Sequence, residues 1–176
     1  AQGHVTNLDV QQMARWFDVD GLTADRFRSR VTATFDVKGE GGGRYPLALD
    51  ATAAVVDSEL FKASFPRLDL VARFSDDDTR VQAVGQVAGL DPPELSDEID
   101  VAGRLNGTFD VDATVRDYTM TVDSVDVSGR VDLTQSTIGD LAIDNASIEG
   151  KYAKREAELD RFDITVLKGY TDRDLS

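Results

Sequence analysis

The sequence predicts an all-β protein: an elongated, largely antiparallel β-structure with one short helix near residues 8–17. Three observations support this fold class. Apolar residues alternate with polar ones through most of residues 100–166, the intervening positions are rich in Asp, and glycines punctuate the pattern. Because residues two apart share one face of a strand, one face is apolar and the other acidic. This pattern is typical of antiparallel strands covered on one side only.

The first half of the chain predicts the helix and four strands. Apolar side chains crowd one broad face of the segment from Leu8 to Phe17, and Asn7 or Asp9 is placed to cap it. Gly39 to Gly43 predicts a turn. Pro92 and Pro93 mark a loop, with a short helical turn expected at residues 94–97. Alternation predicts strands at residues 28–39, 45–56, 68–74 and 81–87.

The two halves of the chain resemble each other. Thr-Phe-Asp-Val occurs at residues 34–37 and again at 108–111, and Ser58 has its counterpart in Ser136. The offsets of these matches differ, so a repeat requires connections of unequal length. We expect residues 1–176 to form a single β-rich segment with repeat units 1–88 and 89–170. The abrupt, strand-like start of the sequence indicates a fragment of a longer protein.

Composition excludes several classes of partner and site. The formal net charge is −14 and the pI about 4.3, which argues against nucleic acid, whose phosphates require Lys and Arg. The sequence contains no cysteine, so disulfides, thiolate metal sites and cysteine nucleophiles are excluded. Either the cytosol or a bacterial envelope fits this absence. No apolar run approaches the ~20 residues that span a bilayer.

Candidate catalytic and metal-binding motifs are weak. His4 is the single histidine, so a Ser-His-Asp triad would have to use it, and no Gly-x-Ser-x-Gly elbow is present. The glycine-rich segment 39–44 lacks Gly-Lys-Ser/Thr, and a hairpin turn is its ordinary interpretation. Residues 76–78 are three aspartates that suit a solvated hairpin tip better than a calcium site. We therefore expect no enzymatic activity, no metal and no cofactor.

The apolar stripe has two interpretations. It forms either the closed interior of a sandwich or barrel or an open groove that receives a ligand. One helix is too little to cover many strands, and the stripe residues are mostly small or medium, which favours the groove. Among them, Val111, Val127, Val131, Ile143 and Ile148 are expected to face inward and stay partly open. The full set of candidate lipid-groove residues is Val31, Phe35, Leu47, Leu49, Leu68, Leu70, Phe74, Phe109, Val111, Val115, Val127, Val131, Leu133, Ile138, Leu141, Ile143, Ile148, Tyr152, Phe162 and Ile164.

Two segments carry a family resemblance. Residues 128–150 contain Gly-x-Val-x-Leu, Ser-x-Ile and Leu-x-Ile-x-x-Ala-x-Ile-x-Gly strands, and residues 3–14 read as a strand followed by a short Leu-Asp helix. In these segments the chain resembles the TamB and AsmA-like proteins of diderm bacteria. The resemblance implies an elongated, twisted antiparallel β-groove, or β-taco, that carries phospholipid across the periplasm between the inner and outer membranes. It further implies an inner-membrane anchor on the full-length protein. It also implies an outer-membrane barrel partner, TamA-like, bound through parts that this chain lacks.

Two other functions remain open alongside the lipid conduit. One is a closed structural or adhesive β-repeat module of a bacterial surface protein, in which the apolar stripe fills its own interior. The other is a carbohydrate-binding β-sandwich, which is disfavoured by the shortage of aromatic side chains, since Trp16 is the single tryptophan.

Overall fold

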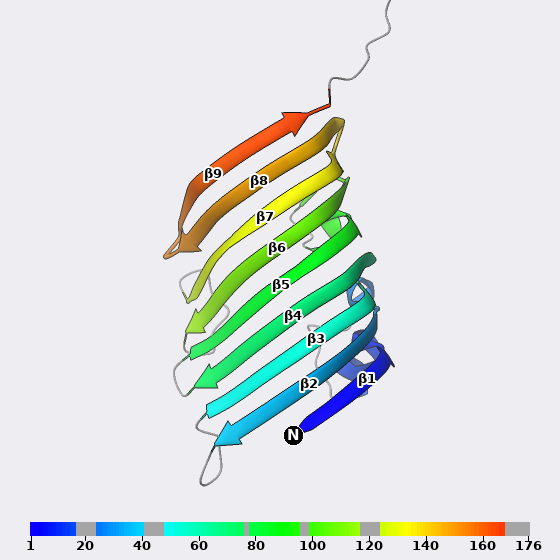
Figure 1. Cartoon of the computed structure of the whole chain (residues 1–176), viewed down its shortest axis with the longest axis vertical. Helices are drawn as coiled ribbons and strands as arrows, with labels where there is room; N and C mark the ends of the chain where they lie inside the picture. Colours follow the sequence, from blue (N-terminus) through cyan, green and yellow to red (C-terminus); the bar gives the residue numbers. More distant parts are fainter. Residues whose placement is uncertain (17–23, 41–47, 76–77, 96–98, 117–123, 168–176) are drawn as a thin grey trace, which may run out of the picture.

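A computed structural model shows one nine-stranded antiparallel sheet whose strands lie in chain order (Figure 1). The structure describes residues 1–16, 24–40, 48–75, 78–95, 99–116 and 124–167. The sheet does not close into a barrel. The strands are β1 Gln2–Leu8, β2 Arg30–Glu40, β3 Ala48–Leu60, β4 Ala63–Ser75, β5 Asp78–Leu90, β6 Gly103–Arg116, β7 Val125–Ile138, β8 Leu141–Ala153 and β9 Glu156–Val166.

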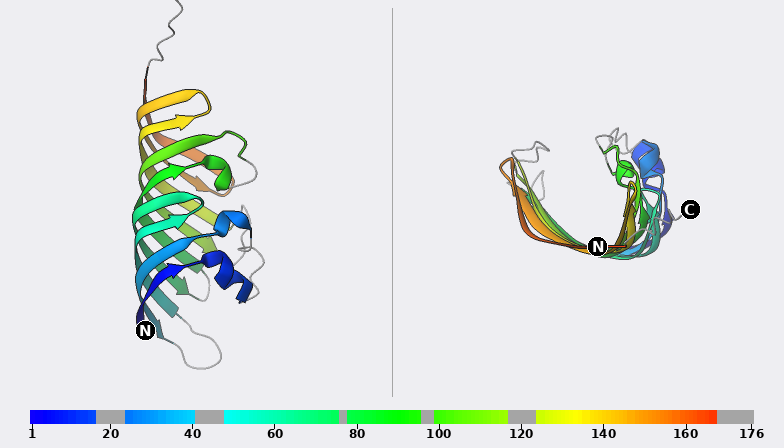
Figure 2. Two further views of the ribbon diagram at one scale, coloured as in Figure 1. Left: turned by 90° about the vertical axis from the view of Figure 1, so that its right-hand side faces the viewer. Right: turned by 90° about the horizontal axis from the view of Figure 1, so that it is seen from above.

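The sheet is folded along its length into a trough, which is U-shaped when seen end-on (Figure 2). The C-terminal ends of β1, β3, β5 and β7 and the N-terminal ends of β2, β4, β6 and β8 lie at one rim, which we call the helical rim. Three short helices lie there: α1 (Val10–Trp16), η2 (Asp25–Phe27) and η3 (Pro92–Glu94). The opposite ends of the same strands form the other rim, which we call the hairpin rim. The predicted all-β, antiparallel groove with a single short α-helix is therefore confirmed among the described residues.

A line of strand irregularities runs beneath the helical rim. The registers of β1–β2, β4–β5, β5–β6 and β6–β7 each shift near the strand ends at this rim. Asn7, Asp57, Gly89 and Gln135 adopt positive φ angles of 54°, 44°, 77° and 43° along the same line. Because a bulge bends its strand and increases the local twist, successive bulges fold the whole sheet along one line.

The buried core lies inside this bend. One cluster contains Ala63, Phe65, Val87 and Leu90, all close to the ends of their strands at the helical rim. Phe109 packs against it, edge-on to Phe65 at a ring-centroid distance of 6.4 Å. A second cluster, Leu133, Ile143 and Ala146, occupies the corresponding place in β7 and β8. The corner of the trough is thus filled by its own side chains.

The helical elements differ slightly from the prediction. Helix α1 begins at Val10, because the Asp9 carboxylate accepts hydrogen bonds from the backbone N–H groups of Gln11 and Gln12 and so caps it. Its predicted last residue, Phe17, lies outside the described residues. Of the expected helical turn at 94–97, residues 96–97 lie outside the described residues, and a 3₁₀ turn spans Pro92–Glu94. The fixed φ of proline favours its first helical position. Of the predicted turn at 39–43, residues 39–40 belong to β2 and the rest lie outside the described residues.

Candidate functional site

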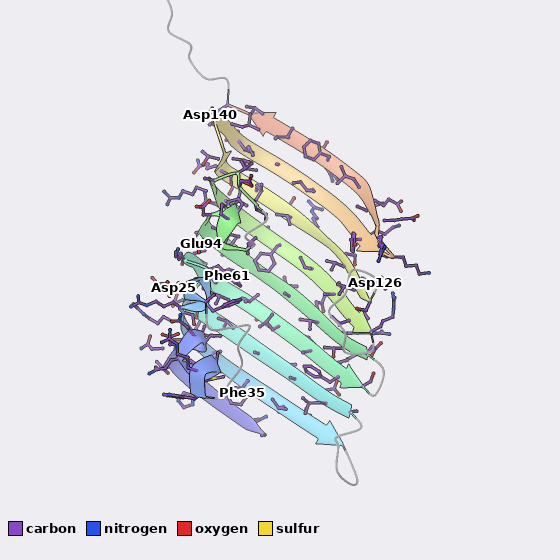
Figure 3. The ribbon with its side chains drawn as sticks, turned by 180° about the vertical axis from the view of Figure 1, so that it is seen from behind. Asp25, Phe35, Phe61, Glu94, Asp126 and Asp140 are labelled. Carbon is purple, nitrogen blue, oxygen red and sulfur yellow. The ribbon has the colours of Figure 1, made fainter. Side chains whose placement is uncertain are left out.

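Strand register assembles the candidate site on the concave face. One cross-strand row contains Phe35, Ala53, Leu70, Ala83 and Val111, on five successive strands. A neighbouring row contains Leu68, Gly85, Phe109, Val131, Ile148 and Phe162. Because the rows stay in step from strand to strand, apolar side chains from distant parts of the sequence gather on one face. Figure 3 looks into the trough and shows Phe35 and Phe61 on this side.

The predicted groove residues are mostly half-buried. Leu47 lies outside the described residues, Leu133 and Ile143 are buried, and Leu141, Phe162 and Ile164 are exposed. A sandwich interior would bury such residues beneath a second layer, and no second layer covers them in the described part of the chain. The apolar face is therefore accessible. The half-buried members are Val31, Phe35, Leu49, Leu68, Leu70, Phe74, Phe109, Val111, Val115, Val127, Val131, Ile138, Ile148 and Tyr152.

Ile143 differs from the other inward-facing residues that were expected to stay open. Val111, Val127, Val131 and Ile148 are half-buried, but Ile143 is only 2% exposed. It lies opposite Ser136, on the line of bulges, where residues of β7 and β8 at the bend pack around it. Side chains beneath the helical rim therefore form the core, whereas those on the trough floor line the groove.

Small residues complete the floor and were not among the predicted groove residues. Ala53, Ala83 and Ala113 occupy the same rows as the larger side chains. Gly85 is covered by its neighbours, because a Cβ there would lie 3.0 Å from Phe109 Cζ and 3.1 Å from Leu68 Cδ1. Alternation alone could have included the alanines, but the covering of Gly85 depends on cross-strand register, which the sequence does not state.

The convex face is polar and internally paired. Arg130 donates from Nε and Nη2 to both carboxylate oxygens of Asp132, at 2.8 and 2.9 Å. This hydrogen-bonded contact lowers the pKa of Asp132 and raises that of Arg130. A hydrogen bond to Glu158 likewise raises the pKa of Lys151, on the next strands along. Such exposed pairs hold each charge in its ionised form at neutral pH and keep this face hydrated.

The three short helices pack onto the helical rim through few contacts. Phe27 of η2 meets Phe61 of the β3–β4 turn edge-on, with ring centroids 5.7 Å apart. Gln11 of α1 is buried and donates from Nε2 to the Asp25 carboxylate at 3.3 Å. Lys62 pairs with Glu94 of η3. These contacts hold the helices at the edge of the trough rather than across its mouth (Figure 2).

His4 lies exposed on β1, opposite Thr34. Within the described ranges, no three His, Asp or Glu side chains gather in a way that could hold a metal ion. The same part of the chain contains no helix long and apolar enough to cross a bilayer.

Comparisons with protein-family models, with curated proteins and with solved structures return no match for this chain.

Proposed function

We propose that the concave groove carries phospholipid, with acyl chains on the apolar floor and headgroups at the open mouth. One observation carries the proposal: an apolar face, half-buried over most of the sheet, runs from strand to strand, and no second layer covers it in the described residues. A protein that needed this face only for its own stability would bury it.

The dimensions suit lipid tails. Nine strands span eight spacings of about 4.8 Å, or about 38 Å measured across the strands. One leaflet of a ~30 Å hydrocarbon core is about 15 Å deep, so the floor accommodates about two tails end to end. Each methylene removed from water contributes about 0.8 kcal/mol. Many weak contacts of this kind hold an acyl chain without a specific pocket and let it slide.

The distribution of polar groups supports the same orientation of the lipid. The charged pairs lie on the convex face and at the rims, whereas the floor rows contain Ala, Val, Leu, Ile, Phe and Gly. A headgroup placed on the floor would lose its hydration without a partner. At the mouth it keeps its hydration, so the trough separates the two parts of a phospholipid.

The cellular setting follows from the resemblance to the TamB and AsmA-like proteins alone. On that basis we place the groove in the periplasm of a diderm bacterium, as a segment of a conduit between the inner and outer membranes. The full-length protein would be anchored in the inner membrane. An outer-membrane barrel, TamA-like, would be reached through other parts of it.

A pair of charge substitutions tests the groove. Val127 is half-buried on the concave face, and its neighbour Ser128 is exposed on the convex face. Val127→Asp should lower the free energy of unfolding by only about 1 kcal/mol, the span of β propensities, because the carboxylate stays hydrated. It should nevertheless slow the transfer of fluorescent phospholipid between vesicles. Ser128→Asp should change neither quantity.

Ile143→Arg supplies the contrasting case. Ile143 is 2% exposed, so the substitution leaves an uncompensated buried charge and should cost about 3–5 kcal/mol. If Val127→Asp unfolds the protein as Ile143→Arg does, the floor is a closed core, and a structural or adhesive β-module is the better interpretation.

Photocrosslinking locates the lipid directly. A benzophenone amino acid at Val111 or Val127 should form phospholipid adducts in cells, whereas one at Ser128 or Gln82, exposed on the convex face, should not. Equal labelling of the two faces, or none on either, would contradict the proposal.

A further inference from the structure

Strand β9 presents an apolar edge that no described strand pairs with. All of its residues are exposed, including Leu159 at 60%, Phe162 at 55% and Ile164 at 39%. Strand β5 carries the same alternation, yet its Gly85, Val87 and Leu90 are buried. The difference arises because β6 pairs with the far edge of β5, whereas no described strand pairs with the far edge of β9.

Strands β1 and β5 match position by position. Ala, Gly and Val recur at positions 1, 3 and 5 of the sequence and again at 83, 85 and 87, in β5. Asn7 and Gly89, at matching positions, both have positive φ, and Leu-Asp follows in each case. The carboxylates of both aspartates accept backbone hydrogen bonds, Asp9 from the N–H of Gln11 in α1 and Asp91 from the N–H of Gly103.

The remaining strands match with different spacings. Strand β4 (Ala63–Ser75) aligns end to end with strand β8 (Leu141–Ala153), and the same alignment places the buried Ser58 on the buried Ser136. Fewer residues separate matching positions in β2 and β6 than in β1 and β5. This is because the β1–β2 connection (9–29) is longer than the β5–β6 connection (91–102). For β3 and β7 the separation is larger again, because β6 and the connection after it are together four residues longer than β2 and its connection.

Strand β9 takes the position of β5 in this scheme. Leu68 of β4 pairs with Gly85, and its counterpart in β8, Ala146, pairs with Ile164. One extra residue, Asp160, enters β9 at the register shift opposite Glu149 and Gly150. Phe162, Ile164 and Val166 therefore occupy the positions of Ala83, Gly85 and Val87.

We propose that the chain is built from a four-strand unit, β1–β4 and β5–β8, that β9 is the first strand of a further unit, and that its free edge binds an antiparallel protein strand of the β6 type. That strand would alternate apolar and polar residues and would carry a small residue opposite Ile164. These units divide the chain between β4 and β5, rather than at residue 88 as expected from the sequence.

The requirement for a small residue follows from two glycine–phenylalanine pairs. Gly3 faces Phe35, and Gly85 faces Phe109, in matching places of the two units. A Cβ on Gly3 would lie 2.5 Å from Phe35 Cζ, and one on Gly85 would lie 2.8 Å from the Arg67 carbonyl oxygen and 3.0 Å from Phe109 Cζ. Each phenyl ring thus occupies the space that the glycine leaves. In β9 the corresponding residue is Ile164, whose side chain would compete with an incoming phenylalanine for that space.

Backbone N–H groups along the outer edge of β9 point away from β8, where an added strand could accept hydrogen bonds from them. The Leu167 N–H donates to the Ala142 carbonyl, so it points toward β8. Since N–H groups alternate in direction along an antiparallel strand, those of Ile164 and Val166 point away from β8, toward the free edge. A strand added there would pair with these groups, as in other cases of β-augmentation.

Peptide binding tests the proposal. Two fluorescent peptides are compared, one with the sequence of Gly103–Arg116 and one with Phe109→Ala in that sequence. The unmodified chain should bind the Phe109→Ala peptide at least tenfold more tightly than the parent peptide. The Ile164→Gly chain should reverse this preference. Amide hydrogen exchange should slow at Ile164 and Val166 when the peptide is bound.

Ile164→Pro is the blocking variant, since it removes an outward N–H without removing a hydrogen bond to β8. It should abolish binding, and exchange protection in β7 and β8 should show that the fold persists. The proposal is overturned if neither peptide binds the unmodified chain, or if both chains prefer the same peptide. It is also overturned if β9 pairs with β9 of a second copy, seen as a dimer that the peptide does not dissociate.

Discussion

Two buried serines hold the bend of the trough at single-residue scale. Ser58 and Ser136 are 1% and 2% exposed, and each lies directly after a residue with positive φ. The Ser136 hydroxyl accepts a hydrogen bond from the N–H of Asn106 at 2.9 Å and donates to a backbone carbonyl. Ser58 does the same with the N–H of Thr32. Each hydroxyl therefore satisfies backbone groups that the bulge would otherwise leave unpaired.

Removing either hydroxyl should destabilise the sheet. Ser136→Ala leaves the Asn106 N–H without its acceptor, and a loss of about 1–3 kcal/mol in the free energy of unfolding is expected. Urea denaturation followed by far-ultraviolet circular dichroism measures this loss. Ser128→Ala, exposed on the same strand, is the control and should stay within about 0.5 kcal/mol of the unmodified protein. Equal stability of the two variants would show that the Ser136 hydroxyl is not needed at the bulge.

At the scale of the element, strand bends depend on glycine where two backbones approach closely. Gly107 lies beside the register shift of β6 and β7. A Cβ at this position would lie 2.1 Å from the carbonyl oxygen of Asp132. Because the obstacle is backbone rather than a side-chain tip, a larger residue requires β6 and β7 to separate.

Gly107→Ala should therefore lower the free energy of unfolding by about 1–3 kcal/mol or more, as overpacked sites do. Strand propensity does not explain such a loss, because alanine favours strands no less than glycine does. Gly39→Ala is the matched control, since its Cβ would meet the flexible tip of Leu49 at 3.3 Å. Thermal unfolding should separate the two variants clearly. A Gly107→Ala protein as stable as the Gly39→Ala protein would contradict the close approach of β6 and β7.

Most strands could be predicted from the sequence because alternation directly reports a half-buried sheet. The alternation through residues 28–39 and 81–87 located β2 and β5 to within a few residues at each end. Strand ends near the helical rim were missed because bulges interrupt the period of two. Pro66 and Arg67, for example, are both exposed and follow one another in β4, so the predicted strand began only at Leu68.

The sequence predicted which face is apolar but not how deeply each of its residues is buried. The sequence pattern placed Val127, Val131 and Ile148 on the apolar face, and they lie there. It could not separate the buried Leu133 and Ile143 from them, because burial depends on where the sheet bends. That bend is produced by residues such as Ser136 and Gln135, whose types alone do not mark them as bulge residues.

At the scale of the whole molecule, the sheet runs continuously from β1 to β9 and stays open on its concave side. Every strand pairs with its sequence neighbour, so each added strand lengthens the molecule without thickening it. The two rims and the floor of the trough all lie away from the molecule's centre of mass. The fold therefore resembles a repeat protein in which each element contacts chiefly its neighbours, rather than a sandwich around one central core.

Small-angle X-ray scattering separates these two shapes. A compact chain of 176 residues has a radius of gyration of about 16 Å, and the open trough should exceed that value, with a pair-distance distribution that tails toward long distances. Because no described strand pairs with the outer edge of β9, the measurement is extrapolated to low concentration. The Ile164→Pro protein, with its outward N–H removed, should give the same radius without a concentration dependence. If the radius instead falls to the compact value for both proteins, the sheet has curled until its rims meet. The floor rows containing Val111 and Val131 would then be an interior, closed to lipid.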